Sequence, residues 1–185
     1  MQRDLVERAQ RGDRESFGAL AGASIARLYN LAQLLLGDPD LAEDAVQEAL
    51  IVTWRDLRAL RDPDRFDSWL HRILVRCAYR VASKERRRID RPRIVETGDA
   101  STPDSAGDLA NRDEVDRGFR HLKTEYRAVL VCHHYLGLSD DEAAEVLGVP
   151  AGTVKSRLHR ATAAMRAALD ADSRQDERIA ARTMR

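Results

Sequence analysis

Apolar residues recur along most of this chain at spacings of three and four, the period of an α-helix that is buried along one side. We find no convincing stretch in which apolar and polar residues alternate, as they do in a half-buried β-strand. The pattern therefore predicts an all-α protein. The expected helices cover residues 2–11, 15–36, 39–60, 65–88, 112–120, 122–135, 139–147 and 150–169.

One segment interrupts this helical pattern. The stretch "ETGDASTPDSAGD" has almost no apolar content and is typical of a flexible linker. It predicts two small helical domains, joined by an acidic flexible linker, and a polar tail. The expected boundaries are 1–90, 91–111 for the linker, 112–170, and 171–185 for the tail. Because such a linker buries too little apolar surface to offset its ordering entropy, we expect the domains to move independently.

The second domain contains the pattern of a helix-turn-helix. Ser139 and Glu142 form an S-x-x-E capping box that opens the short helix "DDEAAEVLG". Gly148 stands where a helix C-cap glycine belongs, and Pro150 suits the first turn of the next helix. Two helices joined by a tight turn are therefore expected here.

The second of these helices has no acidic residue between Gly148 and Leu169. Its apolar stripe is expected to contain Val154, Leu158, Ala161, Met165 and Leu169. Its other sides carry the hydroxyl, imidazole and cationic groups of Thr153, Lys155, Ser156, Arg157, His159 and Arg160. Such groups bind phosphates and base edges in a DNA major groove, where a carboxylate would be repelled. The alternative is a solvated basic face on an ordinary bundle helix.

The helix expected over residues 39–60 has two different sides. Small apolar residues share one side, and Asp44, Gln47 and Glu48 surround Ile51 on the other. An apolar centre with a polar rim is typical of a protein interface, and its partner should be basic. The alternative is a surface helix with one stray isoleucine.

The helix expected over residues 65–88 combines cations with aromatic rings. Its buried stripe should contain Leu70, Ile73, Leu74, Cys77 and Val81. Its start and its opposite arc carry Arg65, Trp69, Arg72, Val75, Arg76, Tyr79 and Arg80. Aromatic rings stack on unpaired bases and cations bind the backbone, so this arc is a candidate surface for single-stranded DNA. Trp69 is as readily a core residue.

The overall charge balance conceals two basic segments. The chain has 31 Lys and Arg against 31 Asp and Glu. Residues 61–94 nevertheless hold 11 basic against 5 acidic residues, and residues 150–169 hold 4 against none. The acidic excess lies elsewhere, most densely in residues 95–118. Two basic blocks of this kind indicate a protein that binds nucleic acid.

These segments, in this order, resemble a bacterial extracytoplasmic-function (ECF, group IV) RNA polymerase sigma factor. "GDPDLAEDAVQEALIVTWRDL" is similar to region 2.2 of that family and "FDSWLHRILVRCAYRVASKERRR" to regions 2.3–2.4. "YLGLSDDEAAEVLGVPAGTVKSRLHRATAAM" is similar to region 4.2. The resemblance covers about residues 12–90 and 115–169.

The resemblance implies partners and roles. Asp44, Gln47 and Glu48 fall on the family's D-x-x-Q-E pattern, which implies binding to the clamp helices of the β′ subunit of core RNA polymerase, with the β subunit also a partner. The helix 65–88 would capture and help melt the minus-ten promoter element, and residues 150–160 would read the minus-thirty-five element. An anti-sigma factor is a further possible partner.

The chain also departs from the family's pattern. The family usually has Asn at Arg76 and often has Asp at Arg80, so a minus-ten preference does not transfer. A frequent Leu-Pro pair is replaced by Leu122-Lys123, and the usual Glu-Ile-Ala by Glu142 followed by two alanines.

Other classes of function are weighed against this one. A stand-alone helix-turn-helix regulator that binds an operator is the main alternative, but it has no use for the acidic face around Glu48. Adjacent residues on a helix point about 100° apart, so Cys132, His133 and His134 do not form a metal site, and no cofactor is expected. No phosphate loop, nucleophile elbow or catalytic dyad indicates an enzyme.

Apolar runs such as "LAQLLL" are too short for a membrane span, and two cysteines suit a reducing compartment, so we expect a cytoplasmic protein without membrane insertion.

Overall fold

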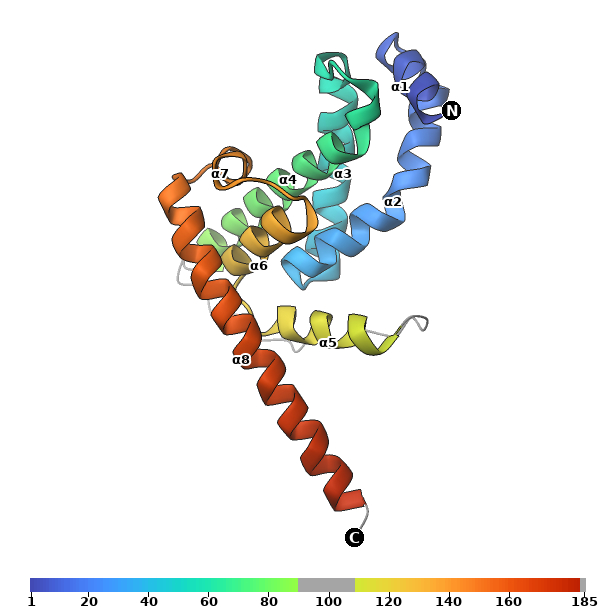
Figure 1. Cartoon of the computed structure of the whole chain (residues 1–185). Coiled ribbons are helices and arrows are strands. Elements are labelled where there is room, and N and C mark those ends of the chain that lie inside the picture. The colour runs from blue at the N-terminus through green and yellow to red at the C-terminus, as the bar shows by residue number, and fades with distance from the viewer. Residues whose placement is uncertain (90–108, 184–185) are drawn as a thin grey trace.

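The computed structural model describes residues 1–89 and 109–183, and this part of the chain is helical with short turns and no strand (Figure 1), which confirms the all-α prediction. The helices are α1 (Gln2–Gln10), α2 (Arg14–Leu36), α3 (Pro39–Asp56), α4 (Phe66–Ile89), α5 (Leu109–Arg120), α6 (Thr124–Leu130), α7 (Asp140–Leu147) and α8 (Ala151–Thr183). Two 3₁₀ turns, η1 (Leu57–Ala59) and η2 (Pro63–Arg65), join α3 to α4, and a π-helical turn, η3 (Val131–Tyr135), follows α6.

Side-chain caps account for the sharp starts of these helices. The Asp13 carboxylate accepts hydrogen bonds from two backbone N–H groups at the start of α2, and Asp38 does the same for α3. The predicted capping box is present, since Ser139 and Glu142 bond each other's backbone N–H groups at the start of α7. Gly148 ends α7 in the left-handed conformation with φ 65°. These caps satisfy N–H groups that have no partner within the helix.

The N-terminal unit is a bundle in which α2, α3 and α4 pack on one another and α1 packs on α2. The expected inward sides of α3 and α4 are buried, with Ala42, Ala45, Leu70 and Leu74 all at 2% exposure or less. Thr53 is fully buried, and its hydroxyl donates to the Ala49 carbonyl, so the core leaves this polar group satisfied.

Helix α2 is long and apolar enough by composition to cross a membrane. Its inward side nevertheless lies in the bundle, where Leu20, Leu28 and Leu35 are almost fully buried. It packs on α1, α3 and α4, and also on α6 of the C-terminal unit. These contacts are those of a core helix, for which an apolar composition is ordinary.

The C-terminal unit consists of α5 to α8, with α6 and α7 packed on the first half of α8 and α5 crossing α8 further along (Figure 1). A glycine lies at the crossing. A Cβ atom at Gly118 would lie 2.8 Å from the Met165 sulfur and 3.2 Å from a Leu169 methyl group. A larger residue at this position of α5 would require the Met165 and Leu169 side chains to shift.

Two predicted boundaries in this unit are wrong. Helix α8 continues to Thr183 instead of ending at residue 169, because no Gly or Pro follows Gly152 and most of the residues are good helix formers. Helix α5 begins at Leu109, three residues before the predicted start and inside the predicted linker 91–111. The rest of the linker, residues 91–108, lies outside the described residues.

The two units pack directly on each other, which differs from the expected independent movement. Helices α6 and α7 lie on α4, and α5 and α6 contact α2 (Figure 1). Arg127 of α6 is buried at this junction, with 8% exposure, and donates to the carbonyls of Arg120 and Leu122. Its guanidinium lies beside Gly37, the left-handed C-cap of α2. Burial lowers the pKa of Arg127, and nearby Arg120 lowers it further.

The junction predicts a difference between two glycine substitutions. Gly37→Ala and Gly148→Ala both place a side chain at a left-handed position, which costs about 1–2 kcal/mol. Only at Gly37 would the new Cβ also meet a neighbour, 2.5 Å from Nη1 of Arg127, whereas nothing lies within 4 Å at Gly148. We expect Gly37→Ala to lower the free energy of unfolding more than Gly148→Ala, as measured by urea denaturation. Equal losses would show that Arg127 does not hold this position in solution.

Candidate nucleic-acid interface

The outer side of α4 presents the predicted combination of cations and rings. Arg76 and Arg80 of α4 are exposed, as is Arg65 of the preceding turn η2, and Trp69, Arg72 and Tyr79 are half-buried. Trp69 packs against the core with part of its surface, and its role as a stacking surface for bases stays a prediction.

Val75, which the sequence placed on the same open arc, is fully buried, so that assignment is wrong. Its neighbours one turn away, Arg72 and Tyr79, both bond residues of the C-terminal unit. Residues three and four apart share a helix face, so Val75 lies on the side of α4 that α6 and α7 cover.

Polar contacts between described residues connect this side of α4 to the C-terminal unit. Arg72 forms an ion pair with Glu142 of α7, with 2.8 Å between nitrogen and oxygen. Arg86 forms another with Glu125 of α6 at 2.9 Å. Arg157 of α8 donates a hydrogen bond of 2.9 Å to the Tyr79 hydroxyl. Residues predicted for two different DNA elements, Tyr79 and Arg157, are thus in direct contact.

The two carboxylates in these contacts are held in their charged form. Hydrogen bonds from Ser139 lower the pKa of Glu142, and Arg72 lowers it further. Burial acts to raise the pKa of Glu125, but hydrogen bonds from its own backbone N–H and from Arg86 outweigh burial and lower it. Glu142 accepts hydrogen bonds from two partners. One carboxylate oxygen accepts from the Ser139 backbone N–H at the start of α7, and the other accepts from Arg72.

The predicted DNA-reading side of α8 is divided between solvent and the neighbouring unit. Val154 and Ala161 are buried as expected. The exposed residues are Lys155, Ser156, His159 and Arg160. Thr153 and Arg157 are half-buried, and Arg157 is turned toward α4 by its bond to Tyr79.

The predicted interface on α3 is open to solvent. Asp44 and Gln47 are exposed, and Ile51 keeps 66% of its surface exposed. Glu48 is half-buried and forms an ion pair of 2.6 Å with Arg80 of α4. The Glu48 carboxylate therefore links the exposed side of α3 to the outer side of α4.

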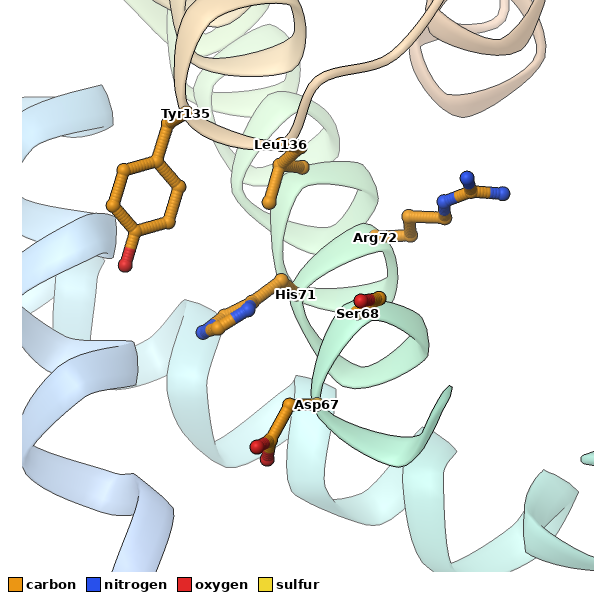
Figure 2. Close-up of a pocket in the computed structure, with 6 residues that line it drawn as sticks. All are labelled: Asp67, Ser68, His71, Arg72, Tyr135 and Leu136. Carbon is orange, nitrogen blue, oxygen red and sulfur yellow. The ribbon is translucent and has the colours of Figure 1, made fainter. Parts of the chain in front are cut away.

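A small cavity of 290 Å³ lies between the two units (Figure 2). It is lined by Asp67, Ser68, His71, Arg72, Tyr135 and Leu136. Figure 2 shows the His71 imidazole between the Tyr135 ring and the Asp67 carboxylate, while the Arg72 guanidinium points away from it. Burial lowers the pKa of His71 more than Asp67 raises it. A neutral imidazole packed edge-on to a ring, with centroids 5.9 Å apart, is a packing contact.

Comparison with known proteins identifies the family of this chain. A family model described as "Sigma-70 region 2" matches residues 20–88, and one described as "Sigma-70, region 4" matches residues 112–165. The RNA polymerase sigma-H factor of Pseudomonas aeruginosa is 32% identical over 177 residues, which cover 89% of this chain and 92% of that protein. The ECF RNA polymerase sigma-E factor of Escherichia coli is 30% identical, covering 87% and 90%. The chain belongs to the ECF sigma factors.

Solved structures share the fold of this sigma factor. CnrH, in complex with the cytosolic domain of CnrY, is 28% identical with a TM-score of 0.56, and the match covers 92% of this chain and 98% of CnrH. The sigma factor RpoE from Bartonella quintana, in complex with the anti-sigma factor NepR, gives a TM-score of 0.58 at 24% identity, covering 85% and 99%. The N-terminal unit is called region 2 below, and the C-terminal unit region 4.

Sequence reasoning missed the residues that connect region 2 to region 4. Arg86, His71 and Tyr135 were assigned no role, and Glu142 was assigned only its cap. The sequence offered one weak signal, since Val75 is an apolar residue among the cations of α4. A single apolar residue on a surface is common, so Val75 alone did not predict that another unit covers this side.

The burial of the two cysteines predicts how fast their thiols react. Cys77 and Cys132 are at 1% exposure or less, and burial raises the pKa of both thiols, that of Cys132 to about 12. The thiolate is the reactive form, and it is disfavoured at both sites. We expect both thiols to react with a disulfide reagent at pH 8 at least about 100-fold more slowly in the native protein than in urea. Fast reaction of either thiol in the native protein would contradict this burial.

Proposed function

We propose that this sigma factor binds core RNA polymerase through the α3 face, that is Asp44, Gln47, Glu48 and Ile51. The observation that carries the proposal is the exposure of Ile51 amid carboxylates and an amide, in the same chain as two cationic helix faces. A regulator that acts alone at an operator needs the cationic faces but not this one. The acidic rim suits a basic partner, as the clamp helices of the β′ subunit would be.

Region 2 then captures and helps to melt the minus-ten element through α4. Arg65, Arg76 and Arg80 supply positive charge, and Trp69 and Tyr79 supply rings for unstacked bases. Region 4 reads the minus-thirty-five element through the start of α8, where Lys155, Ser156, His159 and Arg160 are exposed, with Thr153 and Arg157 beside them. The protein works as an initiation factor in the cytoplasm, and the polymerase carries out the chemistry.

An anti-sigma factor is a further partner that we propose by likeness. CnrH and the RpoE of Bartonella quintana are both described in complex with a second protein, CnrY and the anti-sigma factor NepR. Run-off transcription with core polymerase on a promoter library is the experiment that tests the function as a whole. Failure to initiate at any promoter would leave a stand-alone regulator as the better hypothesis.

Charge reversal on the α3 face tests the polymerase contact. Glu48→Lys places a cation against a basic partner, so we expect core polymerase to bind it roughly tenfold or more weakly, measured by titration of labelled sigma factor. The substitution also breaks the ion pair with Arg80. Arg80→Ala is the matched control, because it breaks the same pair and leaves the α3 face unchanged. Equal weakening by both variants would show that the ion pair, and not the face, is responsible.

Two substitutions in α8 separate phosphate contacts from base contacts. Arg160→Ala should weaken binding to all minus-thirty-five sequences alike and lower the slope of the salt dependence by roughly one unit. Lys155→Ala should relax the choice of base at particular positions, at a cost of about 1–3 kcal/mol if it contacts a base edge directly. Binding is measured on promoters varied one base at a time at several salt concentrations. If Arg160→Ala changes base preference and leaves the salt slope intact, the two sides of α8 are assigned wrongly.

A further inference from the structure

A group of exposed arginines lies at one end of region 2, where α1 turns into α2 and where η1 and η2 join α3 to α4. Both turns lie at the same end of the bundle, since α1 packs on η1 and η2 (Figure 1). None of these arginines belongs to the promoter contacts proposed for η2, α4 and α8. They are called the corner arginines: Arg11, Arg14, Arg58 and Arg61.

Hydrogen bonds between the two turns bring three of the corner arginines together. The Gln10 side chain donates to the Leu60 carbonyl at 2.7 Å. Arg58 in turn donates to the Gln10 carbonyl at 3.2 Å. Because Arg11 follows Gln10 and Arg61 follows Leu60, these bonds hold both arginines beside Arg58.

An aromatic contact places the fourth arginine at the same corner. The rings of Phe17 in α2 and Trp54 in α3 pack with their centroids 4.9 Å apart. Arg14 lies three residues before Phe17 and therefore on the same side of α2. Arg58 lies four residues after Trp54, in η1. Each of these arginines is thus about one turn of chain from the ring pair.

The carboxylates near this corner are engaged with other arginines. None of the corner arginines forms an ion pair with another described residue. Glu15 is the one acid of the two turns that pairs with none of the described residues either, and it points about 100° away from Arg14 around α2. The pairs that engage the other acids are Arg8–Asp13, Arg55–Asp56, Arg65–Asp62 and Arg3–Asp64.

Unpaired positive charge at the corner favours an anionic partner. A guanidinium group binds a phosphate through two parallel N–H groups, and clustered arginines are typical of a surface that binds nucleic acid. Arg61 lies four residues before Arg65, which belongs to the proposed minus-ten surface. The corner therefore continues that surface beyond the start of α4.

The order of the chain indicates which nucleotides reach the corner. Region 4, which we propose to read the upstream minus-thirty-five element, follows the C-terminal end of α4 in the chain. The corner lies at the other end of α4, next to η2. A strand that leaves the upstream element at one end of α4 passes the corner downstream.

We propose that the corner arginines bind backbone phosphates of the single strand on the 3′ side of the minus-ten element when the sigma factor is bound to polymerase. The inference rests on the proposed function and extends it by a further DNA contact. Phosphate contacts carry no base information, so the corner acts on all promoters alike. It lengthens the melted strand that the sigma factor holds.

The variant that tests the corner is Arg11→Gln combined with Arg61→Gln. Neither side chain bonds another described residue, so we expect an unchanged free energy of unfolding in urea. Arg120→Gln combined with Arg166→Gln is the matched control, because it removes the same charge from exposed positions in region 4. Arg11→Lys combined with Arg61→Lys keeps the charge and should keep the wild-type behaviour.

The measurement is the affinity of polymerase, loaded with each sigma variant, for three labelled single-stranded oligonucleotides. One carries only the minus-ten element of a promoter that the wild type transcribes. The other two extend this strand by about six nucleotides, on the 3′ side or on the 5′ side. Each affinity is measured at about 50 mM and about 200 mM salt, because phosphate contacts are recognised by their salt dependence.

The expected result is a loss of salt dependence on one strand. Each phosphate contact to a single strand adds about 0.7 to the slope of log affinity against log salt, so two contacts add about 1.4. Over this salt range the wild type and the control should therefore lose about sevenfold more affinity for the 3′-extended strand than the glutamine variant loses. All the proteins should bind the unextended strand and the 5′-extended strand alike.

Three results would overturn the corner contact. The first is an equal salt dependence of the wild type and the glutamine variant on the 3′-extended strand, or a difference that appears with the other strands as well. The second is a lysine variant that behaves like the glutamine variant, which would indicate a structural role. The third is weaker binding of the glutamine variant to core polymerase, which would mean that an acidic surface of the polymerase is the partner.

The same experiment separates failure of the corner from failure of the proposed function. If polymerase with the wild-type sigma factor neither transcribes nor binds the unextended strand, the proposed function fails and this inference fails with it. If the unextended strand binds and the glutamine variant changes nothing on the 3′-extended strand, only the corner contact fails.

Discussion

The structure depends on the packing of α4, which lies against helices of both units. One side of α4 enters the region 2 core, where Leu70 and Leu74 are almost fully buried between α2 and α3. Its opposite side carries Val75, which is equally buried because α6 and α7 cover it. Because α4 is buried along two sides, only narrow strips of its surface face solvent. Its arginine side chains lie in those strips. How the two units are arranged therefore depends on whether α6 and α7 cover this side of α4.

The neutral net charge has a structural explanation in the same helix. Part of the basic excess of residues 61–94 is paired in the described structure, since Arg72, Arg80 and Arg86 each face a carboxylate from another helix. Acids placed outside the two basic blocks thus neutralise part of the first block when the chain folds. Such pairs contribute little stability at a surface, so they are easily exchanged for phosphates.

The parts of the fold that could be predicted from sequence are the ones that depend on neighbours within a few residues. The caps at Asp13 and Asp38 and the box of Ser139 and Glu142 bond within three residues, so their residue types alone fix where helices start. Inward stripes follow from helical periodicity. The far end of α8 was predicted wrongly because the polar residues 171–185 were assigned to a tail outside the helix, although no Gly or Pro in that segment breaks a helix.

The candidate site was predicted by residue type but not by environment. Periodicity places Arg72, Val75 and Tyr79 on one arc of α4, yet it does not show whether solvent, DNA or a second domain covers that arc. What covers the arc depends on contacts between residues far apart in the sequence, such as Arg72 and Glu142, which are 70 residues apart. The assumption that the linker leaves the two units independent excluded the third possibility, and Val75 was the residue that contradicted it.

The departure at Arg80 has a physical consequence within region 2. Where the family often has an aspartate, this chain has a guanidinium that bonds Glu48, 2.6 Å away on α3. An aspartate there would repel Glu48, whereas Arg80 attracts it and so ties the α3 face to the α4 face. A basic partner on the α3 face competes with Arg80 for the Glu48 carboxylate. Any partner that takes this carboxylate leaves Arg80 with an unpaired charge at the edge of the α4 face, where a phosphate can neutralise it. The two faces of region 2 are therefore electrostatically coupled through one side chain.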